Sequence, residues 1–240
     1  MRIDILTLLP GLLESYLQEG MIGRACREGL IQINAVQIRD FATDRHKTAD
    51  DSPYGGGAGL IMKAEPVAAA IKSVKRRKKA RVLLMSPQGR TFTHTDARRL
   101  AEDRHIIIIC GRYEGIDERI RQKYVDEEFS IGDYVLTGGE LAALVITDAT
   151  ARFIPGVLGN EQSSQDESFS AGMLEYPQYT KPRVFQKMEV PEVLLSGNHA
   201  QINRWRRTQG LLKTMKNRPD LFAGLQLTEE DKKEIENNCD

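Results

Sequence analysis

Two glycine-containing turns with a central carboxylate are the segments of this chain best suited to chemistry. Residues 110–120, CGRYEGIDERI, follow the apolar run HIIIIC, and residues 128–145, EFSIGDYVLTGGELAALV, repeat the arrangement further along. Neither turn matches GxGxxG, and GxxxxGK[ST] occurs nowhere in the chain. Glu114 and Asp133 would repel a phosphate, whereas they suit a hydroxyl, an amine, a cation or a metal ion. The turns therefore favour an uncharged or cationic nucleoside as ligand, and the simpler alternative is two solvated tight turns.

The segments around these turns alternate between strand and helix patterns. Strands are predicted at residues 2–8, 30–38, 81–87, 105–110 and 127–136. Helical patterns lie between them, and the last runs over residues 137–154 with Thr137 as its expected N-cap. This alternation predicts an α/β fold with a mostly parallel sheet. Ligands of such sheets lie beyond the carboxyl ends of the strands, where residues 86–89, 111–117 and 131–139 are expected.

The composition changes at residues 157–172, VLGNEQSSQDESFSAG, which contain few large apolar side chains. We expect a mobile interdomain linker there. Residues 1–156 would then form the first domain, and residues 173–240 a small, all-helical second domain. The final helix is expected to begin at TEED, a capping box led by Thr228.

The overall composition limits the class of protein. The chain has 240 residues, and its 34 Lys and Arg balance 34 Asp and Glu, so there is no whole-surface attraction to nucleic acid. No apolar run approaches the ~20 residues of a membrane span, and the N-terminus lacks the features of a signal peptide. Three unrelated cysteines indicate a reduced cytoplasmic protein without a disulfide framework. KRRKKAR at 75–81 and NRWRR at 203–207 leave a local basic surface possible, although the first also fits a solvated helix end.

Several longer motifs show a resemblance to a known family. In chain order they are LLPG, SPYGGGAGLIM, LMSPQGRTF, CGRYEGIDERI, SIGDYVLTGGELAA, PGVLGNEQS and YPQYTKP. Together they resemble the bacterial tRNA (guanine-N1)-methyltransferases of the SPOUT class along essentially the whole chain. The resemblance implies transfer of a methyl group from S-adenosylmethionine to N1 of guanosine at tRNA position 37. It also implies a deep trefoil knot, a cytoplasmic homodimer whose sites are each completed by the partner subunit, and a second domain that grips the anticodon arm.

The resemblance also assigns roles to single residues. The cofactor-binding positions that it implies are Leu84, Ser86, Pro87, Gly111, Tyr113, Glu114, Ile131, Gly132, Asp133, Tyr134, Val135, Leu136, Gly138 and Gly139. Arg152 matches the catalytic arginine, and Mg²⁺ is implied near Glu114. The family's general base is an aspartate before Ser-Phe, and here that position holds Glu167, with Asp166 before it. Glu167 is the expected base, and Asp166 is the alternative.

Two other functions remain open at this point. A non-catalytic RNA-binding protein would need only the two basic clusters and stacking on Trp205, but it would leave the carboxylate-bearing turns unexplained. Another SPOUT methyltransferase could act on a ribose 2′-hydroxyl or a different base. The linker carboxylate favours N1 chemistry, because the N1 proton must leave before the nitrogen can accept a methyl group.

Overall fold

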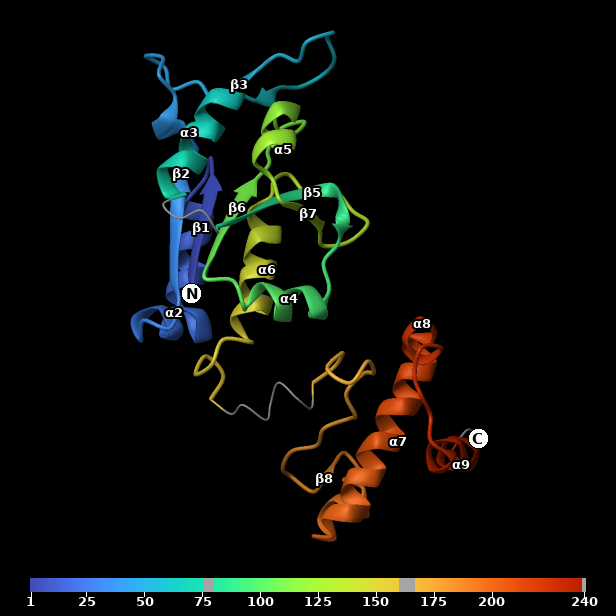
Figure 1. The fold of residues 1–240 in the computed structure, drawn as a ribbon. Coiled ribbons are helices and arrows are strands. Elements are labelled where there is room, and N and C mark those ends of the chain that lie inside the picture. Colours follow the sequence, from blue (N-terminus) through green and yellow to red (C-terminus); the bar gives the residue numbers. More distant parts are fainter. Residues whose placement is uncertain (76–79, 160–166, 239–240) are drawn as a thin grey trace. The chain divides into compact units, whose positions relative to one another are not determined.

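A computed structural model of the chain describes residues 1–75, 80–159 and 167–238. The chain divides into two compact units, Met1–Glu161 and Gln162–Asp240 (Figure 1). Within the described ranges, no helix has both the length and the apolar character needed to cross a membrane.

The first unit is built on a five-stranded sheet in which every neighbouring pair is parallel. Its strand order is β2-β1-β6-β5-β7 (Figure 1). The strands are β1 (Arg2–Thr7), β2 (Gln32–Gln37), β5 (Arg81–Thr91), β6 (His105–Cys110) and β7 (Glu127–Ser130). The predicted α/β fold with a mostly parallel sheet is confirmed.

The sheet is buried on both faces, as its central strand illustrates. Every residue of β6 is buried. Ile106, Ile108 and Cys110 pack in one apolar core, while Ile107 and Ile109 pack in the other. This division follows from the alternation of side chains along a strand. A continuous apolar run such as HIIIIC is therefore what a central parallel strand requires.

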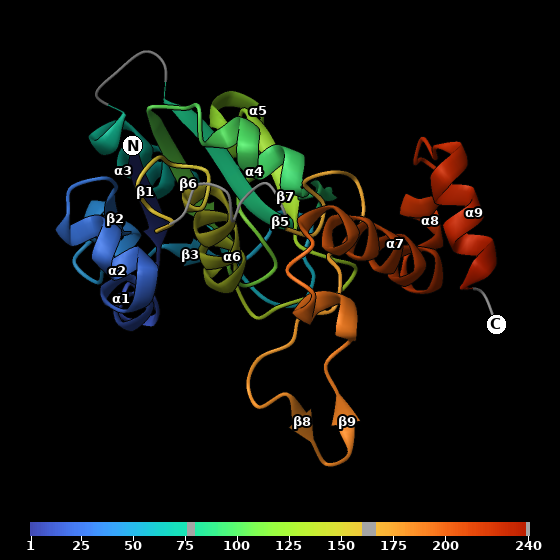
Figure 2. The same ribbon diagram turned by 90° about the horizontal axis from the view of Figure 1, so that it is seen from below.

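Helices cover the two faces (Figure 2). One core contains side chains of α1 (Gly11–Gln18), α2 (Gly20–Arg27), α4 (His94–Leu100) and α6 (Glu140–Ala151). The other contains side chains of α3 (Ala64–Val74) and α5 (Glu118–Tyr124). The long loop after β2 holds the short helix η1 (Ile38–Phe41) and the antiparallel pair β3 (Asp50–Asp51) and β4 (Ile61–Met62).

Several predicted boundaries differ from the structure, and three of them bear on the site. Residues 86–89, expected as a turn, lie inside β5, where the register against β7 shifts between Met85 and Arg90. Strand β7 ends at Ser130 rather than at residue 136, and the chain continues as a loop. Helix α6 begins at Glu140 with Gly139 at the cap position, so Thr137 is not its N-cap. The reason is a tertiary contact, because the Gly139 amide already donates to the Gly111 carbonyl oxygen at 2.8 Å.

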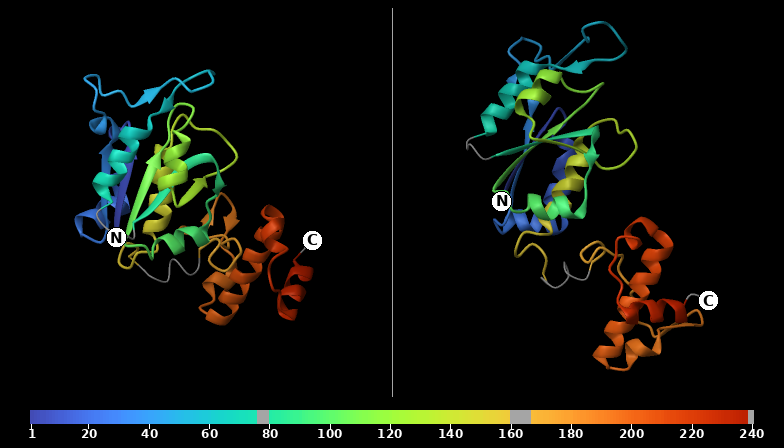
Figure 3. Two further views of the ribbon diagram at one scale, coloured as in Figure 1. Left: turned by 45° about the horizontal axis from the view of Figure 1, so that its top comes forward. Right: turned by 45° about the vertical axis from the view of Figure 1, so that its right-hand side comes forward.

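The second unit consists mainly of helices, drawn in orange and red in Figure 3. They are η3 (Glu192–Leu195), α7 (His199–Asn217), α8 (Pro219–Phe222) and α9 (Glu229–Asn237). Thr228 caps α9 in the predicted capping box, in which Asp231 is the reciprocal partner.

An all-helical second unit is nevertheless wrong in one respect. The unit also contains the antiparallel pair β8 (Val184–Phe185) and β9 (Met188–Glu189). Its two loop residues, Gln186 and Lys187, both have positive φ, which is the conformation of a tight two-residue hairpin. Neither is the glycine or asparagine that normally marks such a turn, so no residue type predicted this hairpin.

Candidate active site

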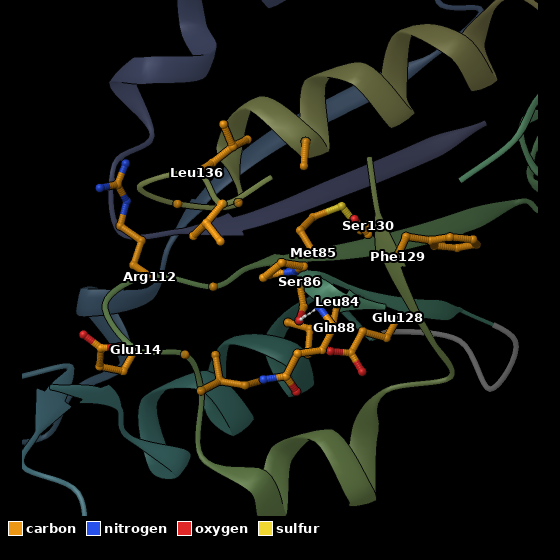
Figure 4. A pocket seen from close by; sticks show the side chains of 18 of the residues that line it. Leu84, Met85, Ser86, Gln88, Arg112, Glu114, Glu128, Phe129, Ser130 and Leu136 are labelled. Atoms are coloured by element: carbon orange, nitrogen blue, oxygen red, sulfur yellow. Dashed lines mark hydrogen bonds between the residues drawn. The ribbon is translucent and has the colours of Figure 1, made fainter. Parts of the chain in front are cut away.

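One pocket of about 370 Å³ lies beside the middle of β5, at the carboxyl ends of β6 and β7 and at the start of α6. Its volume falls in the ~300–1,000 Å³ range of small-molecule sites. Figure 4 shows Arg112 and Glu114 on one side of it and Gln88 and Glu128 on the other. The pocket is therefore at the edge of the sheet where the sequence placed its glycine-containing turns.

All but two of the expected cofactor-binding residues line this pocket. They are Leu84, Ser86, Pro87, Gly111, Tyr113, Glu114, Ile131, Tyr134, Val135, Leu136, Gly138 and Gly139. The exceptions are Gly132 and Asp133. Gly132 is held within its own loop, where the Ser130 hydroxyl donates to its carbonyl oxygen at 2.8 Å and the Tyr134 amide donates to the same oxygen at 2.9 Å.

The loop before α6 packs directly against the end of β6. Arg112 and Gly138 form an antiparallel bridge, beside the Gly139–Gly111 hydrogen bond. A Cβ atom at Gly139 would lie 2.8 Å from the Cα of Cys110 and 3.0 Å from the Cβ of Met85. Only glycine allows this approach, because the nearest of these neighbours is backbone. The chain thus leaves edge strand β7 and returns to the ends of β6 and β5, which closes one side of the pocket.

A buried carboxylate organises that side of the pocket. Glu140 is 2% exposed, and its Oε1 accepts hydrogen bonds from Thr7 Oγ1 at 2.7 Å and from Arg112 Nε at 3.0 Å. Burial, together with the Glu140 charge, raises the pKa of the neighbouring Cys110 thiol well above its ordinary value, although Arg112 opposes this shift. Cys110 is therefore a neutral packing residue and not a nucleophile.

The opposite wall contains a second ion pair. Arg121 pairs with Glu128 at 2.7 Å and donates to the side-chain oxygen Oε1 of Gln88 at 3.2 Å. The backbone amide of Gln88 donates to Ser86 Oγ at 3.1 Å. The sequence reading missed Arg112, Gln88, Arg121 and Glu128 as pocket residues. Arg112, Gln88 and Glu128 lie within the segments already quoted, so their position was an available signal, whereas Arg121 lies just outside them.

Glu114 lies where the long glycine-rich loop meets the pocket. Its amide donates to the Leu60 carbonyl oxygen at 3.0 Å, and the Met62 amide donates to Gly115 O at 2.9 Å. Gly59 has a φ of +81°, a conformation that favours glycine, and a Cβ there would also lie 2.5 Å from Glu114 Cγ. Within the described ranges, no group of three or more His, Cys, Asp or Glu side chains is placed to hold a metal ion. In those ranges, the expected Mg²⁺ near Glu114 thus has no site made of three or more such side chains.

Arg152, one of the expected catalytic residues, does not line the pocket. Arg152 is the C-cap residue of α6, whereas the pocket lies at the start of that helix. Arg152 follows Gly139 by 13 residues, or about 20 Å at ~1.5 Å of rise per residue. This separation exceeds the reach of an arginine side chain. Glu167 belongs to the second unit, and Asp166 lies outside the described residues.

The face of α6 that holds Arg152 also carries two exposed apolar side chains. Leu141, Val145 and Arg152 share that face at helical spacing, and Leu141 and Val145 are 60% and 47% exposed. Asp148, on the same face, accepts a hydrogen bond from the Tyr16 hydroxyl of α1. Leu9 and Leu12 next to Tyr16 are also exposed. We call Leu9, Leu12, Tyr16, Leu141 and Val145 the α1–α6 patch.

Comparison with known proteins identifies the family. A family model described as tRNA (Guanine-1)-methyltransferase TrmD matches residues 1–224. The chain belongs to this family. The match covers the whole sheet, the pocket and most of the second unit, so the tRNA (guanine-1)-methyltransferase family accounts for both units of the chain.

Curated relatives agree with this family assignment. A tRNA (guanine-N(1)-)-methyltransferase of Geobacter metallireducens is 57% identical over 234 residues, which are 97% of this chain and 96% of that protein. Proteins of the same name from Geobacter sulfurreducens and Staphylococcus epidermidis are 56% and 52% identical over 97% and 98% of this chain, and over 95% and 96% of their own lengths. The pocket described above is thus the candidate active site of a tRNA (guanine-1)-methyltransferase.

Proposed function

We propose that this chain transfers a methyl group from S-adenosylmethionine to N1 of the guanosine at position 37 of tRNA. Membership of the tRNA (guanine-1)-methyltransferase family gives the reaction, N1 methylation of a tRNA guanine. The methyl donor follows from that enzyme class. The convergence of the expected cofactor residues on one pocket is the observation that carries the rest of the proposal.

The pocket fits the proposed donor. Leu84, Ile131 and Leu136 offer apolar side chains to an adenine ring, and backbone groups at Gly111 and Gly138 can approach a flat ligand. Three carboxylates, Glu114, Glu118 and Glu128, line it against two guanidinium groups, Arg112 and Arg121, and this excess of negative charge suits a ligand bearing a sulfonium and an ammonium group. When bound, S-adenosylmethionine supplies an electrophilic methyl group and departs as the neutral thioether.

The guanine must lose its N1 proton as N1 takes the methyl group. Glu167 is the proposed acceptor of that proton, a role typically worth ~10²–10⁴-fold in rate. It begins a compact turn, in which the Ser170 amide and hydroxyl both donate to its carbonyl oxygen, at 3.2 and 2.7 Å. The Phe169 amide donates to Met173 O at 2.8 Å. These bonds fix the Glu167 backbone to the second unit, which gives its carboxylate a defined attachment point.

Arg152 is proposed to stabilise the negative charge that develops on guanine O6 as the proton leaves. Because it lies about 20 Å along α6 from Gly139, we propose that it serves the pocket of a second copy of the chain. The α1–α6 patch supports this homodimer. A two-fold interface covers the same surface on both copies, and this patch contains the apolar side chains that need covering, beside Arg152.

Three further parts of the family resemblance are also proposed. The return of the chain from β7 to the ends of β5 and β6 supports a deep trefoil knot, although chain paths of this kind are rare. Glu114 is the proposed Mg²⁺ contact, because Mg²⁺ often uses one or two carboxylates plus water and substrate oxygens. The second unit is proposed to bind the anticodon arm, in the cytoplasm where tRNA is used.

Nucleoside analysis tests the reaction. Methyl-labelled S-adenosylmethionine is incubated with the protein and a tRNA transcript that has guanosine at position 37, and the RNA is digested to nucleosides. The label should appear in N1-methylguanosine. Label in a 2′-O-methylated nucleoside, or no transfer to this transcript, would overturn the proposal. A transcript with adenosine at position 37 is the matched control.

A further inference from the structure

A second pocket, of about 650 Å³, lies entirely within the second unit. It is formed by the segment 176–183, η3 and the first half of α7. None of its lining residues is acidic. The methyl-transfer chemistry proposed above makes no use of it.

Aromatic rings line one part of this pocket. Trp205 of α7 and Tyr179 have their ring centroids 6.4 Å apart with planes tilted by 51°. Tyr179 is 49% exposed, and Trp205 is half-buried, so ring surface remains open to a ligand. Tyr176 lies below the guanidinium of Arg206, whose Cζ is 4.9 Å from its ring centroid. A pocket with open rings suits a flat, unstacked base.

Cations of two kinds occur along α7, and the structure separates them. Arg204 pairs with Glu230 at 2.7 Å, and Arg207 holds Asp231 through two hydrogen bonds of 2.6 and 2.8 Å. The hydrogen bonds from Arg207 keep the pKa of Asp231 below its usual range. Both positive charges are thus already compensated by α9.

Arg206 differs from its two neighbours. It lines the pocket, and within the described ranges it has no ion-pair partner. Its Nε is also buried without a hydrogen-bond partner there. Lys181 and Arg183 line the same pocket and likewise have no ion pair among the described residues. Uncompensated cations beside open aromatic rings are the combination that binds single-stranded nucleic acid.

We propose that this pocket binds one unpaired nucleotide of the tRNA, with its base stacked on Trp205 and Tyr179 and its phosphate contacted by Arg206, Lys181 and Arg183. The inference rests on the proposed function for the identity of the RNA. NRWRR at 203–207 is therefore not a single basic RNA-binding cluster. Trp205 and Arg206 would contact the nucleotide, whereas Arg204 and Arg207 form ion pairs with α9. An unpaired nucleotide is required, because a base inside a helix has no free face for a ring to stack on.

The fluorescence of Trp205 tests the base contact directly, because Trp205 is the single tryptophan of the chain. The full-length protein is titrated with a tRNA transcript that has guanosine at position 37, and with a short single-stranded RNA of its anticodon-loop sequence. Both should quench the fluorescence, whereas S-adenosylmethionine alone should not. Absence of quenching at saturating transcript would overturn the proposal.

Affinity measurements on variants separate the base and phosphate contacts. Trp205→Leu should weaken transcript binding by about tenfold or more, and Trp205→Phe should retain most of the affinity. Arg206→Gln should weaken binding and reduce the slope of log K against log salt by about one. Arg204→Gln, two residues away and already paired with Glu230, is the matched control and should change neither.

The controls separate this proposal from the reaction itself. Each variant should bind S-adenosylmethionine like wild type in calorimetry, because the first unit is unchanged. Unchanged transcript affinity in both Trp205→Leu and Arg206→Gln would overturn the nucleotide site even if wild type forms N1-methylguanosine. Failure of wild type to form N1-methylguanosine would instead overturn the proposed function. Trp205→Phe keeps an aromatic ring at this position. If it retains affinity while Trp205→Leu loses it, the loss reflects the missing ring and not a misfolded second unit.

Discussion

A mixed dimer with Arg152→Ala on one chain and Gly111→Val on the other should retain about half of the wild-type methylation rate. Gly111 lines the cofactor pocket, and a Cβ there would meet only Met85 O, at an ordinary 3.5 Å. The fold should therefore accept valine, while the added methyl groups obstruct the cofactor. Arg152 lies about 20 Å along α6 from Gly139, so its loss should affect only the partner's pocket.

The expected magnitudes follow from counting intact sites in a two-fold dimer. In this mixed dimer, the chain with the open pocket receives Arg152 from its partner, and the other site lacks both parts, so about half of the activity remains. When both substitutions are on one chain and the other chain is wild type, each site lacks one part. That dimer should fall to ~1% or less, because loss of a charge-stabilising group typically costs ~10²–10³-fold.

The assay uses two affinity tags. The two chains are co-expressed, mixed dimers are isolated by sequential purification, and single-turnover rates are measured with saturating S-adenosylmethionine and transcript. If each site were contained in one chain, the activities of the two mixed dimers would be reversed. The dimer of one doubly substituted and one wild-type chain would keep about half of the rate, and the dimer with one substitution on each chain would be inactive. That reversal would refute the assignment of Arg152 to the partner's pocket, and a monomer in solution would refute the dimer.

Three further outcomes are expected. Gly111→Val alone should abolish detectable S-adenosylmethionine binding in calorimetry while its thermal transition stays cooperative, and normal affinity would remove this pocket as the cofactor site. Glu167→Gln should lower the single-turnover rate by ~10²-fold or more with cofactor affinity unchanged, whereas a smaller loss than that of Asp166→Asn would move the base to Asp166. Asp96→Asn should lower the free energy of unfolding at pH 7 by ~1–3 kcal/mol. Arg90 donates hydrogen bonds of 2.5 and 2.8 Å to the Asp96 carboxylate, and in the variant the acceptor side chain is neutral.

The Asp96 effect has a defined pH dependence. Burial raises the pKa of Asp96, but hydrogen bonds from Arg90 and Thr93 outweigh burial and lower that pKa to about 2. A lowered folded-state pKa contributes stability above the ordinary value near 3.8, and this stability is lost as the pH falls toward 2. Urea unfolding of wild type and Asp96→Asn should therefore differ most near neutral pH and converge near pH 2. A constant difference across this range would contradict the charge-based explanation.

Local sequence rules predicted the sheet and the edge at which the pocket lies. The run HIIIIC forms a fully buried strand, because a parallel sheet covered on both faces needs apolar side chains in both directions. The glycine-containing turns after the strands at 105–110 and 127–130 were predicted to lie at that edge, and residues of both turns line the pocket. These features depend on residues near one another in the sequence.

Features that depend on contacts between residues far apart in the sequence could not be predicted from local sequence rules. Arg112 is placed by Glu140, which is itself held by Thr7 from the first strand. The register shift in β5 depends on its pairing with β7, where a Cβ at Gly89 would meet the Glu128 backbone at 2.5 Å. The separation of Arg152 from the pocket could be estimated only from the observed ends of α6. The family resemblance names Arg152 as catalytic but does not say where in the fold it lies.

Position mapping on tRNA tests the central claim most directly. Transcripts that differ only in which of positions 36, 37 and 38 holds guanosine are methylated by the full-length protein and read by reverse transcription, which N1-methylguanosine arrests because it blocks base pairing. The account predicts arrest adjacent to position 37, only in the transcript with guanosine there, and its loss without S-adenosylmethionine. Arrest at another guanosine, or methylation of the position-37 transcript without any arrest, would contradict it.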